Sequence, residues 1–309
     1  MRRFVTVLAV FLCSTPALAA PKVIASVVPV HGIVAAVMGA TGEPELLLQG
    51  SMPEHRATFT ATQVARLGKA DLVFIIGHGL EAKLAQMSGS EAVNGKKFVE
   101  LSEAPGVMTL PVRGGGAWEA GDHAHAEESH AEPAPGVLGF DPHVWLDPEN
   151  AKAMALEAAA ELGKADPANA AVYVANAKSF AASVDETAAV IDIELMAVRD
   201  KPYVVFHDAY HYFENRFGLA AVGSIADVSA RAPSARRLRE IRGTLAASKA
   251  VCVFREPQYD DRAISTVIEG SAARAGVLDP LGAKLTPGPA AYQQLLRALA
   301  ASLRACLAG

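Results

Sequence analysis

The feature that most constrains the fold of this chain is an alternation of short apolar runs with longer amphipathic ones. The short runs are rich in Val and Ile and flanked by Gly, Pro or charged residues, which is typical of buried strands. They lie at Val23–Val28, Asp71–Ile76, Lys97–Leu101, Pro202–Phe206, Ala221–Ile225, Ala250–Phe254 and Gly276–Leu278. The helical patterns between them include Gly32–Met38, Ala61–Leu67, Pro148–Leu162 and Ala235–Ser248. This alternation predicts an α/β fold with parallel sheets, in which ligands bind beyond the carboxyl ends of the strands.

Two features divide the chain. Residues 111–137 are low in complexity, with a triple glycine and several prolines, and are predicted to form a mobile loop. Residues 168–199 contain neither Pro nor Gly, and a helix of that length would span roughly 45 Å, more than one lobe needs. We therefore expect an N-terminal α/β lobe over residues 20–165, a connecting helix over 166–200 and a C-terminal α/β lobe over 201–309.

The N-terminus has the three parts of a secretory signal. Arg2 and Arg3 precede the apolar run Phe4–Leu12, and Ala17-Leu18-Ala19 forms an A-x-A cleavage site. The apolar run is too short to cross a bilayer as a helix. We expect residues 1–19 to be removed and the remaining chain to be exported to the periplasm.

The composition excludes several classes of protein. With 51% hydrophobic and 20% charged residues, the chain has enough apolar surface for packed cores and is not a disordered protein. Its formal charge is −5, and without Arg2 and Arg3 of the signal the balance is 26 basic against 33 acidic residues, or −7. A nucleic-acid partner would require a basic surface, so none is expected.

Two cysteines remain after the signal, which contains the third. Cys252 lies in the strand-like run Ala250–Phe254, and Cys306 lies in a helical pattern at Tyr292–Leu307. An even number of cysteines in an oxidising compartment favours a disulfide, which would attach the last helix to a central strand. The alternative is a pair of buried free thiols.

Three of the nine histidines lie at positions suited to ligand binding. His55 occupies a turn before a predicted helix, His143 lies just before another, and His207 ends the strand-like run Pro202–Phe206. Long stretches of chain separate them, so only the tertiary fold could bring them together. Taken singly, each is better explained as a surface or packing histidine than as a ligand.

The order of the motifs resembles a known family, the zinc-binding proteins of high-affinity ABC uptake systems, which are the ZnuA-like branch of the metal-binding periplasmic proteins. The resemblance covers nearly all of the mature chain. Its motifs are Pro53-Glu54-His55, Ala70-Asp71-Leu72-Val73, Gly79-Leu80-Glu81, the His-rich loop, Asp141-Pro142-His143-Val144-Trp145-Leu146-Asp147-Pro148, Phe206-His207-Asp208-Ala209-Tyr210, Tyr212-Phe213, Phe217-Gly218-Leu219, Phe254-Arg255-Glu256-Pro257-Gln258 and Leu278-Asp279-Pro280-Leu281-Gly282.

The resemblance implies two (β/α)-type lobes joined by a rigid helix, with a metal site in the cleft between them. The family's three zinc-binding histidines fall on His55, His143 and His207. In the manganese and iron branch the third position is usually a carboxylate, whereas imidazole suits zinc better. For the fourth ligand we favour Asp279, which follows a predicted strand, with Glu54 or water as the alternative.

The sequence departs from the family pattern around the first ligand. The family commonly has an aromatic residue two positions after this histidine and a Pro-x-Asp helix start, but here Ala57 and Ala61-Thr62-Gln63 stand in those places. The packing of this loop is therefore expected to differ. His31 and His78 also occupy predicted strand-end loops, where they are candidates to assist the ligands.

The low-complexity loop contains His123, His125 and His130 together with three carboxylates within nine residues. A mobile tract of this kind can bind zinc only weakly, because ordering it costs about 1 to 2 kcal/mol per residue. We interpret it as an accessory site for zinc capture or sensing. The alternative is a solvated tether that happens to contain histidine.

The resemblance implies a receptor that captures Zn²⁺ and delivers it to an ABC permease without catalysing a reaction. We expect a monomer, with a periplasmic zinc chaperone as a further candidate partner. The alternatives are a manganese or iron receptor of the same architecture, an adhesin-like surface protein and a zinc hydrolase. A hydrolase is disfavoured because the H-x-x-x-H pair His207 and His211 has Asp208 where the Glu base of H-E-x-x-H should be.

Overall fold

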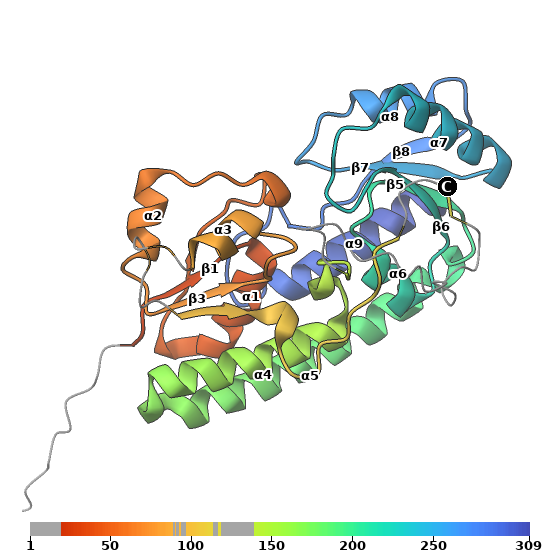
Figure 1. Cartoon of the computed structure of the whole chain (residues 1–309). Coiled ribbons are helices and arrows are strands. Elements are labelled where there is room, and N and C mark those ends of the chain that lie inside the picture. Colours follow the sequence, from red (N-terminus) through yellow and green to blue (C-terminus); the bar gives the residue numbers. More distant parts are fainter. Residues whose placement is uncertain (1–19, 89, 91–92, 94–96, 114–116, 119–138) are drawn as a thin grey trace, which may run out of the picture.

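The structure, a computed structural model, describes residues 20–88, 90, 93, 97–113, 117–118 and 139–309. The predicted signal over residues 1–19 and the three histidines of the low-complexity loop lie outside the described residues. Two separate four-stranded sheets are present, one in each half of the chain, and all their strands run parallel (Figure 1). The predicted α/β class with parallel sheets is confirmed.

The first sheet forms the N-terminal lobe. Its strands pair in the order β2-β1-β3-β4. The strands are β1 Val23–Ala25, β2 Glu45–Leu46, β3 Leu72–Ile75 and β4 Lys97–Glu100, and the helices of this half are α1 Val28–Met38, α2 Ala61–Leu67, α3 Ala82–Met87 and α4 Pro148–Ala165. All four residues of β3 are buried, as expected for a central strand covered on both faces. Strand β3 therefore lies inside the large hydrophobic core.

The second sheet forms the C-terminal lobe. Its strands pair in the order β6-β5-β7-β8. The strands are β5 Tyr203–His207, β6 Ala221–Ala226, β7 Cys252–Arg255 and β8 Arg274–Val277, and the helices are α6 His211–Phe217, α7 Ala235–Ser248, α8 Arg262–Ile268 and α9 Ala291–Leu307. Neighbouring residues of β5 point to opposite faces: Val205 joins the large core shared by the two lobes, and Val204 joins a second cluster with Ile241 of α7 and Ile264 of α8.

A long helix joins the lobes, as predicted. Helix α5 spans Ala170–Leu195, about 39 Å at 1.5 Å per residue, with a 3-10 turn at either end. It packs along α4 and also contacts α1 and α9 (Figure 1). The connection between the lobes is therefore a packed helix rather than a free linker.

Helix α9, which the sequence places in the C-terminal lobe, packs against both lobes. It contacts α1 and α5 as well as β8. A Cβ atom added to Gly32 of α1 would come within 2.8 Å of the backbone nitrogen of Tyr292, so the glycine permits this close approach. Near the other end of α9, Cys306 forms the predicted disulfide with Cys252 of β7. Helix α9 is thus a second connection between the halves.

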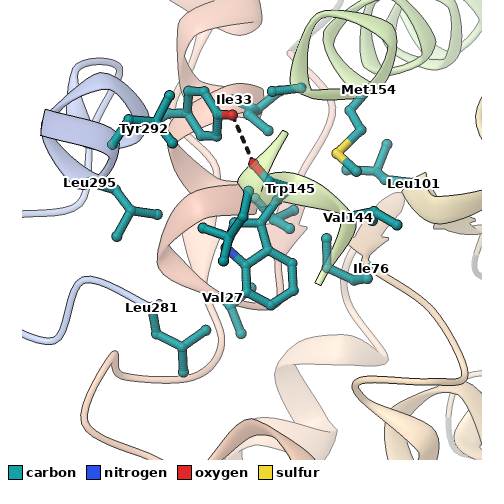
Figure 2. Packing of buried hydrophobic residues seen from close by; sticks show 14 of the residues in the cluster. Val27, Ile33, Ile76, Leu101, Val144, Trp145, Met154, Leu281, Tyr292 and Leu295 are labelled. Carbon is teal, nitrogen blue, oxygen red and sulfur yellow. Dashed lines mark hydrogen bonds between the residues drawn. The ribbon is translucent and has the colours of Figure 1, made fainter. Parts of the chain in front are cut away.

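The core continues across the contact between the lobes. Trp145 is completely buried there, and Figure 2 shows it between Val27, Leu281 and Tyr292. Its indole N–H donates to the carbonyl of Pro280 at 3.0 Å, and the carbonyl of Trp145 accepts a hydrogen bond from the Tyr292 hydroxyl at 2.8 Å. These contacts fix the chain two residues beyond His143. None of the helices in the described part of the chain is both long and apolar enough to cross a membrane.

Candidate metal centre

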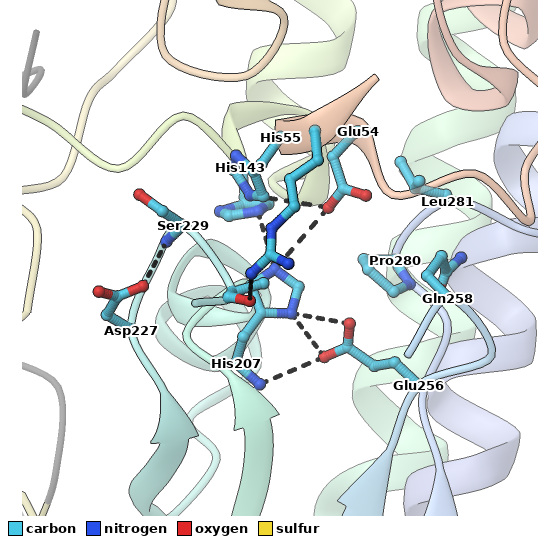
Figure 3. A network of polar contacts seen from close by, with 12 residues as sticks. Glu54, His55, His143, His207, Asp227, Ser229, Glu256, Gln258, Pro280 and Leu281 are labelled. Carbon is cyan, nitrogen blue, oxygen red and sulfur yellow. Dashed lines mark hydrogen bonds and ion pairs between the residues drawn. The ribbon is translucent and has the colours of Figure 1, made fainter. Parts of the chain in front are cut away.

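Four side chains that could hold a metal ion meet between the two lobes. Glu54 and His55 lie on the 3-10 turn Glu54–Arg56, His143 directly precedes another 3-10 turn, and His207 is the last residue of β5. Each residue offers one ligand atom such that all four atoms lie within 4.8 Å of one another (Figure 3). The fold therefore brings together the three histidines that the sequence analysis singled out.

Buried carboxylates orient two of these histidines. Nδ1 of His143 donates to Asp141 at 2.7 Å. Nδ1 of His207 donates to Glu256 at 2.8 Å, a contact that Figure 3 shows. With a proton held on Nδ1, Nε2 is the atom of each ring that a metal ion would bind. The two Nε2 atoms lie 3.2 Å apart. Both rings are thus held with their metal-binding nitrogens directed at a common point.

The first histidine and its neighbour carry buried polar atoms without hydrogen bonds. Among the described residues, Nε2 of His55 and both carboxylate oxygens of Glu54 have no hydrogen-bond partner. One oxygen of Glu54 lies 3.7 Å from Nε2 of His55 and 3.8 Å from Nε2 of His207. Leaving a buried carboxylate unpaired is costly, and a divalent cation among these atoms would satisfy all of them. The residues present therefore fit a metal ion.

Burial and neighbouring charges set the protonation of the cluster. Burial lowers the pKa of His55 and His143 well below the ordinary value, and the neighbouring His207 adds to the effect. Burial raises the pKa of Glu54 to about 7. For His207 burial favours the neutral ring, but Glu256 and Glu54 outweigh it and raise the pKa to about 9. A metal that binds at neutral pH must therefore displace a proton from His207.

Asp279, the residue favoured as fourth ligand, lies outside this group. Its carboxylate accepts hydrogen bonds from the backbone N–H groups of residues 281–283, at 2.6 to 3.1 Å, and from Nε2 of Gln258 at 2.8 Å. The carboxylate of Asp279 therefore already serves as the hydrogen-bond acceptor of the turn that follows β8. Glu54, named as the alternative, occupies the position beside the three histidines, and the geometry favours it as the fourth ligand.

The other histidines considered as helpers have different partners. His31 is buried, and its Nε2 bonds to the carbonyl of Pro44 at 2.8 Å. His78 is exposed and pairs with Glu100 at 2.8 Å. Neither belongs to the group of ligand atoms. The ligands are instead supported by Asp141 and Glu256, which the sequence analysis did not assign to the site, although both lie in the quoted motifs.

The H-x-x-x-H pair does not form the helical metal site of a metalloprotease. His207 ends β5, whereas His211 begins α6, so the two histidines do not share one face of a helix. His211 is also absent from the group of ligand atoms. The spacing in sequence is therefore coincidental.

Two parallel-sheet lobes joined by a long helix, with a buried metal-binding cluster between them, define a solute-binding protein for a metal ion. The profile of a family described as "Zinc-uptake complex component A periplasmic", ZnuA, matches residues 23–306. A relative from Brucella abortus, named high-affinity zinc uptake system protein ZnuA, is 40% identical over 307 residues, covering 92% of this chain and 91% of its own length. The chain belongs to the ZnuA family, the solute-binding components of zinc uptake systems.

Solved structures agree on the fold. A crystal structure of ZnuA superposes with a TM-score of 0.76 at 24% identity, covering 93% of this chain and 99% of that one. A mutant structure of the laminin-binding adhesin of Streptococcus agalactiae superposes with a TM-score of 0.76 at 25% identity, with the same coverage. Proteins named for zinc uptake and for laminin binding thus share this fold, so the fold alone does not determine the function.

Proposed function

We propose that this protein captures one Zn²⁺ ion with Glu54, His55, His143 and His207 and delivers it to an ABC permease for import. The observation that supports this proposal best is the unsatisfied state of the buried cluster. Three imidazole Nε2 atoms and one carboxylate meet at one place, and the atoms of Glu54 and His55 have no hydrogen-bond partner among the described residues. Such a group is stable when a cation joins it.

The chemistry of the four ligands favours zinc over manganese or iron. Zinc is usually four-coordinate in proteins and binds imidazole nitrogen well, whereas manganese prefers sites rich in oxygen ligands. Here three of the four ligand atoms are nitrogens, including His207 at the position where the manganese and iron branch usually has a carboxylate. This ligand set distinguishes a zinc receptor from a manganese or iron receptor, the main alternative.

The same ligand set argues against catalysis. A catalytic zinc keeps one coordination position open for a water molecule, whereas four protein ligands close the tetrahedral sphere. The nearby carboxylates Asp141 and Glu256 already accept hydrogen bonds from His143 and His207. They orient the ligands and are poorly placed to activate a water molecule, so binding and release are the steps that this site supports.

The remaining parts of the proposal come from the sequence and the family. Residues 1–19 would direct export to the periplasm, where the protein would act as a monomer beside its permease. His123, His125 and His130 would form an accessory zinc-capture site. A periplasmic zinc chaperone is a further candidate partner.

Equilibrium dialysis of untagged, metal-free protein against Zn, Mn and Fe at equal free concentrations tests the proposal. One tightly held zinc ion per chain is expected. His143→Ala should weaken this site by at least about tenfold, since even the loss of supporting residues around a metal costs roughly 10 to 100-fold. The matched control is His78→Ala, which removes an exposed imidazole outside the cluster and should change nothing. Preferred retention of manganese, or tight binding that survives His143→Ala, would contradict the proposal.

A further inference from the structure

The 3-10 turn that carries two of the candidate ligands also carries an arginine that reaches the other lobe. Nη2 of Arg56 donates to the carbonyl of Ala230 at 3.0 Å, across 174 positions of sequence. Ala230 lies in the loop between β6 and α7 of the C-terminal lobe. Arg56 directly follows His55, so this hydrogen bond lies next to the metal centre and joins the two lobes there.

The loop that receives this hydrogen bond has an unusual backbone. Ala230 is buried and has a φ of +50°, a left-handed conformation that non-glycine residues rarely adopt. Asp227 holds the loop: its carboxylate accepts the N–H groups of Ser229 (Figure 3) and Arg231, and its carbonyl accepts the N–H of Ala230. A strained residue persists only where the surrounding structure fixes it. The loop is thus shaped so that the Ala230 carbonyl faces Arg56.

A second contact holds the start of the same segment. The chain between β2 and α2 has no regular structure except the 3-10 turn. Near its beginning, Nε2 of Gln258 in the C-terminal lobe donates to the carbonyl of Gly50 at 2.7 Å. The same amide nitrogen donates to Asp279, which orients it. Gln258 and Arg56 therefore attach the ligand-bearing segment to the opposite lobe on either side of Glu54 and His55.

The positive charge of Arg56 acts on groups beside the metal centre. The ring of Tyr259 lies 5.8 Å from that of His207. Burial raises the pKa of Tyr259 and Glu54 adds to this, while Arg56 opposes it. Arg56 also directly follows His55 in the chain, so its positive charge repels a divalent metal ion held by Glu54 and His55. On electrostatic grounds alone, Arg56 would therefore weaken zinc binding.

We propose that Arg56 is a positioning residue that retains zinc: its hydrogen bond to Ala230 is a latch that holds the ligand-bearing turn on the C-terminal lobe. This inference rests on the proposed function of zinc capture. Breaking the latch lets Glu54 and His55 move away from His143 and His207 together, which speeds zinc release. The latch and the charge of Arg56 thus have opposite effects, and removal of the side chain shows which one dominates.

The test is the rate of zinc release from preloaded mature protein into an excess of a chromogenic chelator, measured by stopped flow. Arg56→Ala should release zinc about tenfold faster than the wild type, as most changes in affinity appear in the dissociation rate. Arg56→Lys keeps the charge but loses the planar fork of donors, so its release should also be faster. Arg66→Ala is the matched control, because it removes an exposed arginine of the same lobe that pairs with Glu45.

Release from Arg56→Ala at the wild-type rate, or more slowly, would overturn the latch, and slower release would show that charge repulsion dominates. Faster release from Arg66→Ala to the same extent would also overturn it, since the effect would then follow net charge. Equilibrium zinc binding by the same wild-type sample separates failure of the latch from failure of the proposed function, zinc capture. If the wild type binds no zinc tightly, the proposed function fails and the latch fails with it. If the wild type binds zinc tightly but releases it as fast as Arg56→Ala does, the latch is wrong and the proposed function stands.

Discussion

Replacing Glu54 by Gln should stabilise the zinc-free protein and at the same time weaken its binding of zinc. The carboxylate of Glu54 is 2% exposed, and neither of its oxygens has a hydrogen-bond partner among the described residues. Without metal, its ionisation in this place opposes folding. With metal, the same charge is a ligand. A neutral side chain of equal size therefore separates the two roles.

The magnitude follows from the pKa of Glu54, which burial raises from about 4.5 to about 7. Because the pKa is higher in the folded state, ionisation destabilises the fold. The penalty is absent below pH 4.5 and complete above pH 7. At about 1.4 kcal/mol per pKa unit, it amounts to about 3 kcal/mol at pH 8. This is a ceiling, because the amide of Gln would also lack partners, and it corresponds to a rise in Tm on the order of 5 to 10 °C.

Thermal unfolding followed by circular dichroism at pH 8, first with a chelator and then with excess zinc, measures both effects. Glu54→Gln should unfold at a higher temperature than the wild type with chelator, and zinc should raise its Tm less. Tenfold weaker binding removes about 1.4 kcal/mol from the stabilisation by zinc. Asp279→Asn is the control. It should unfold earlier in both conditions, because an amide offers the N–H groups of residues 281–283 one acceptor oxygen where the carboxylate offers two, but it should keep the full zinc effect.

The reasoning is refuted if Glu54→Gln lowers the Tm of the zinc-free protein. It is also refuted if Asp279→Asn loses the zinc effect while Glu54→Gln retains it. The second result would restore Asp279 as the fourth ligand and would require the turn after β8 to rearrange on metal binding.

Three further results are expected. Zinc affinity should fall about tenfold per pH unit from pH 9 to pH 7, because the pKa of His207 is raised to about 9 and zinc must displace the proton that this ring binds. Competitive zinc titrations measure the affinity, and a constant value over that range would contradict the prediction. Reduction of the Cys252–Cys306 disulfide, which closes a loop of 54 residues, should cost about 4 kcal/mol of stability in urea titrations, and two free thiols in denatured, unreduced periplasmic protein would disprove the bond. Deletion of residues 122–130 should remove weak zinc equivalents and leave the tight site intact, whereas His207→Ala should abolish the tight site in a parallel titration; the reverse pattern would place the receptor site in the loop.

The elements with the clearest local signals could be predicted from the sequence. The predicted and observed bounds of α2 agree, since Thr60 caps this helix and forms a capping box with Gln63. The bounds of α7 agree as well, and Ser234 caps it. Strand β2 was missed because its two residues, Glu45–Leu46, carry no alternation that could be recognised. It exists only because it pairs with β1.

The candidate site was predictable in its histidines and less so in its carboxylates. His207 ends a strand and belongs to a motif, so sequence alone placed it where ligands bind. The choice between Glu54 and Asp279 depends on which carboxylate has backbone donors nearby, and that is a property of the tertiary fold. Glu256 was missed as a partner of His207 for the same reason, since it is 49 positions from the ring that it orients. Asp141 lies only two residues before His143, so in its case a local signal was present and was not used.

The two helices that run between the lobes limit how the loaded protein can be recognised. Helix α5 packs on α1 and α9, and α9 in turn packs on α1 and is covalently attached to β7. A large rotation of one lobe would have to shear these interfaces together, so the backbone frame of the empty and loaded protein should be nearly the same. A transporter that distinguishes the two forms must then read a small surface, the segment at residues 49–58 and the loop at 227–231 that faces it. The loaded and empty forms would then differ in the positions of about fifteen residues rather than in the shape of the whole molecule.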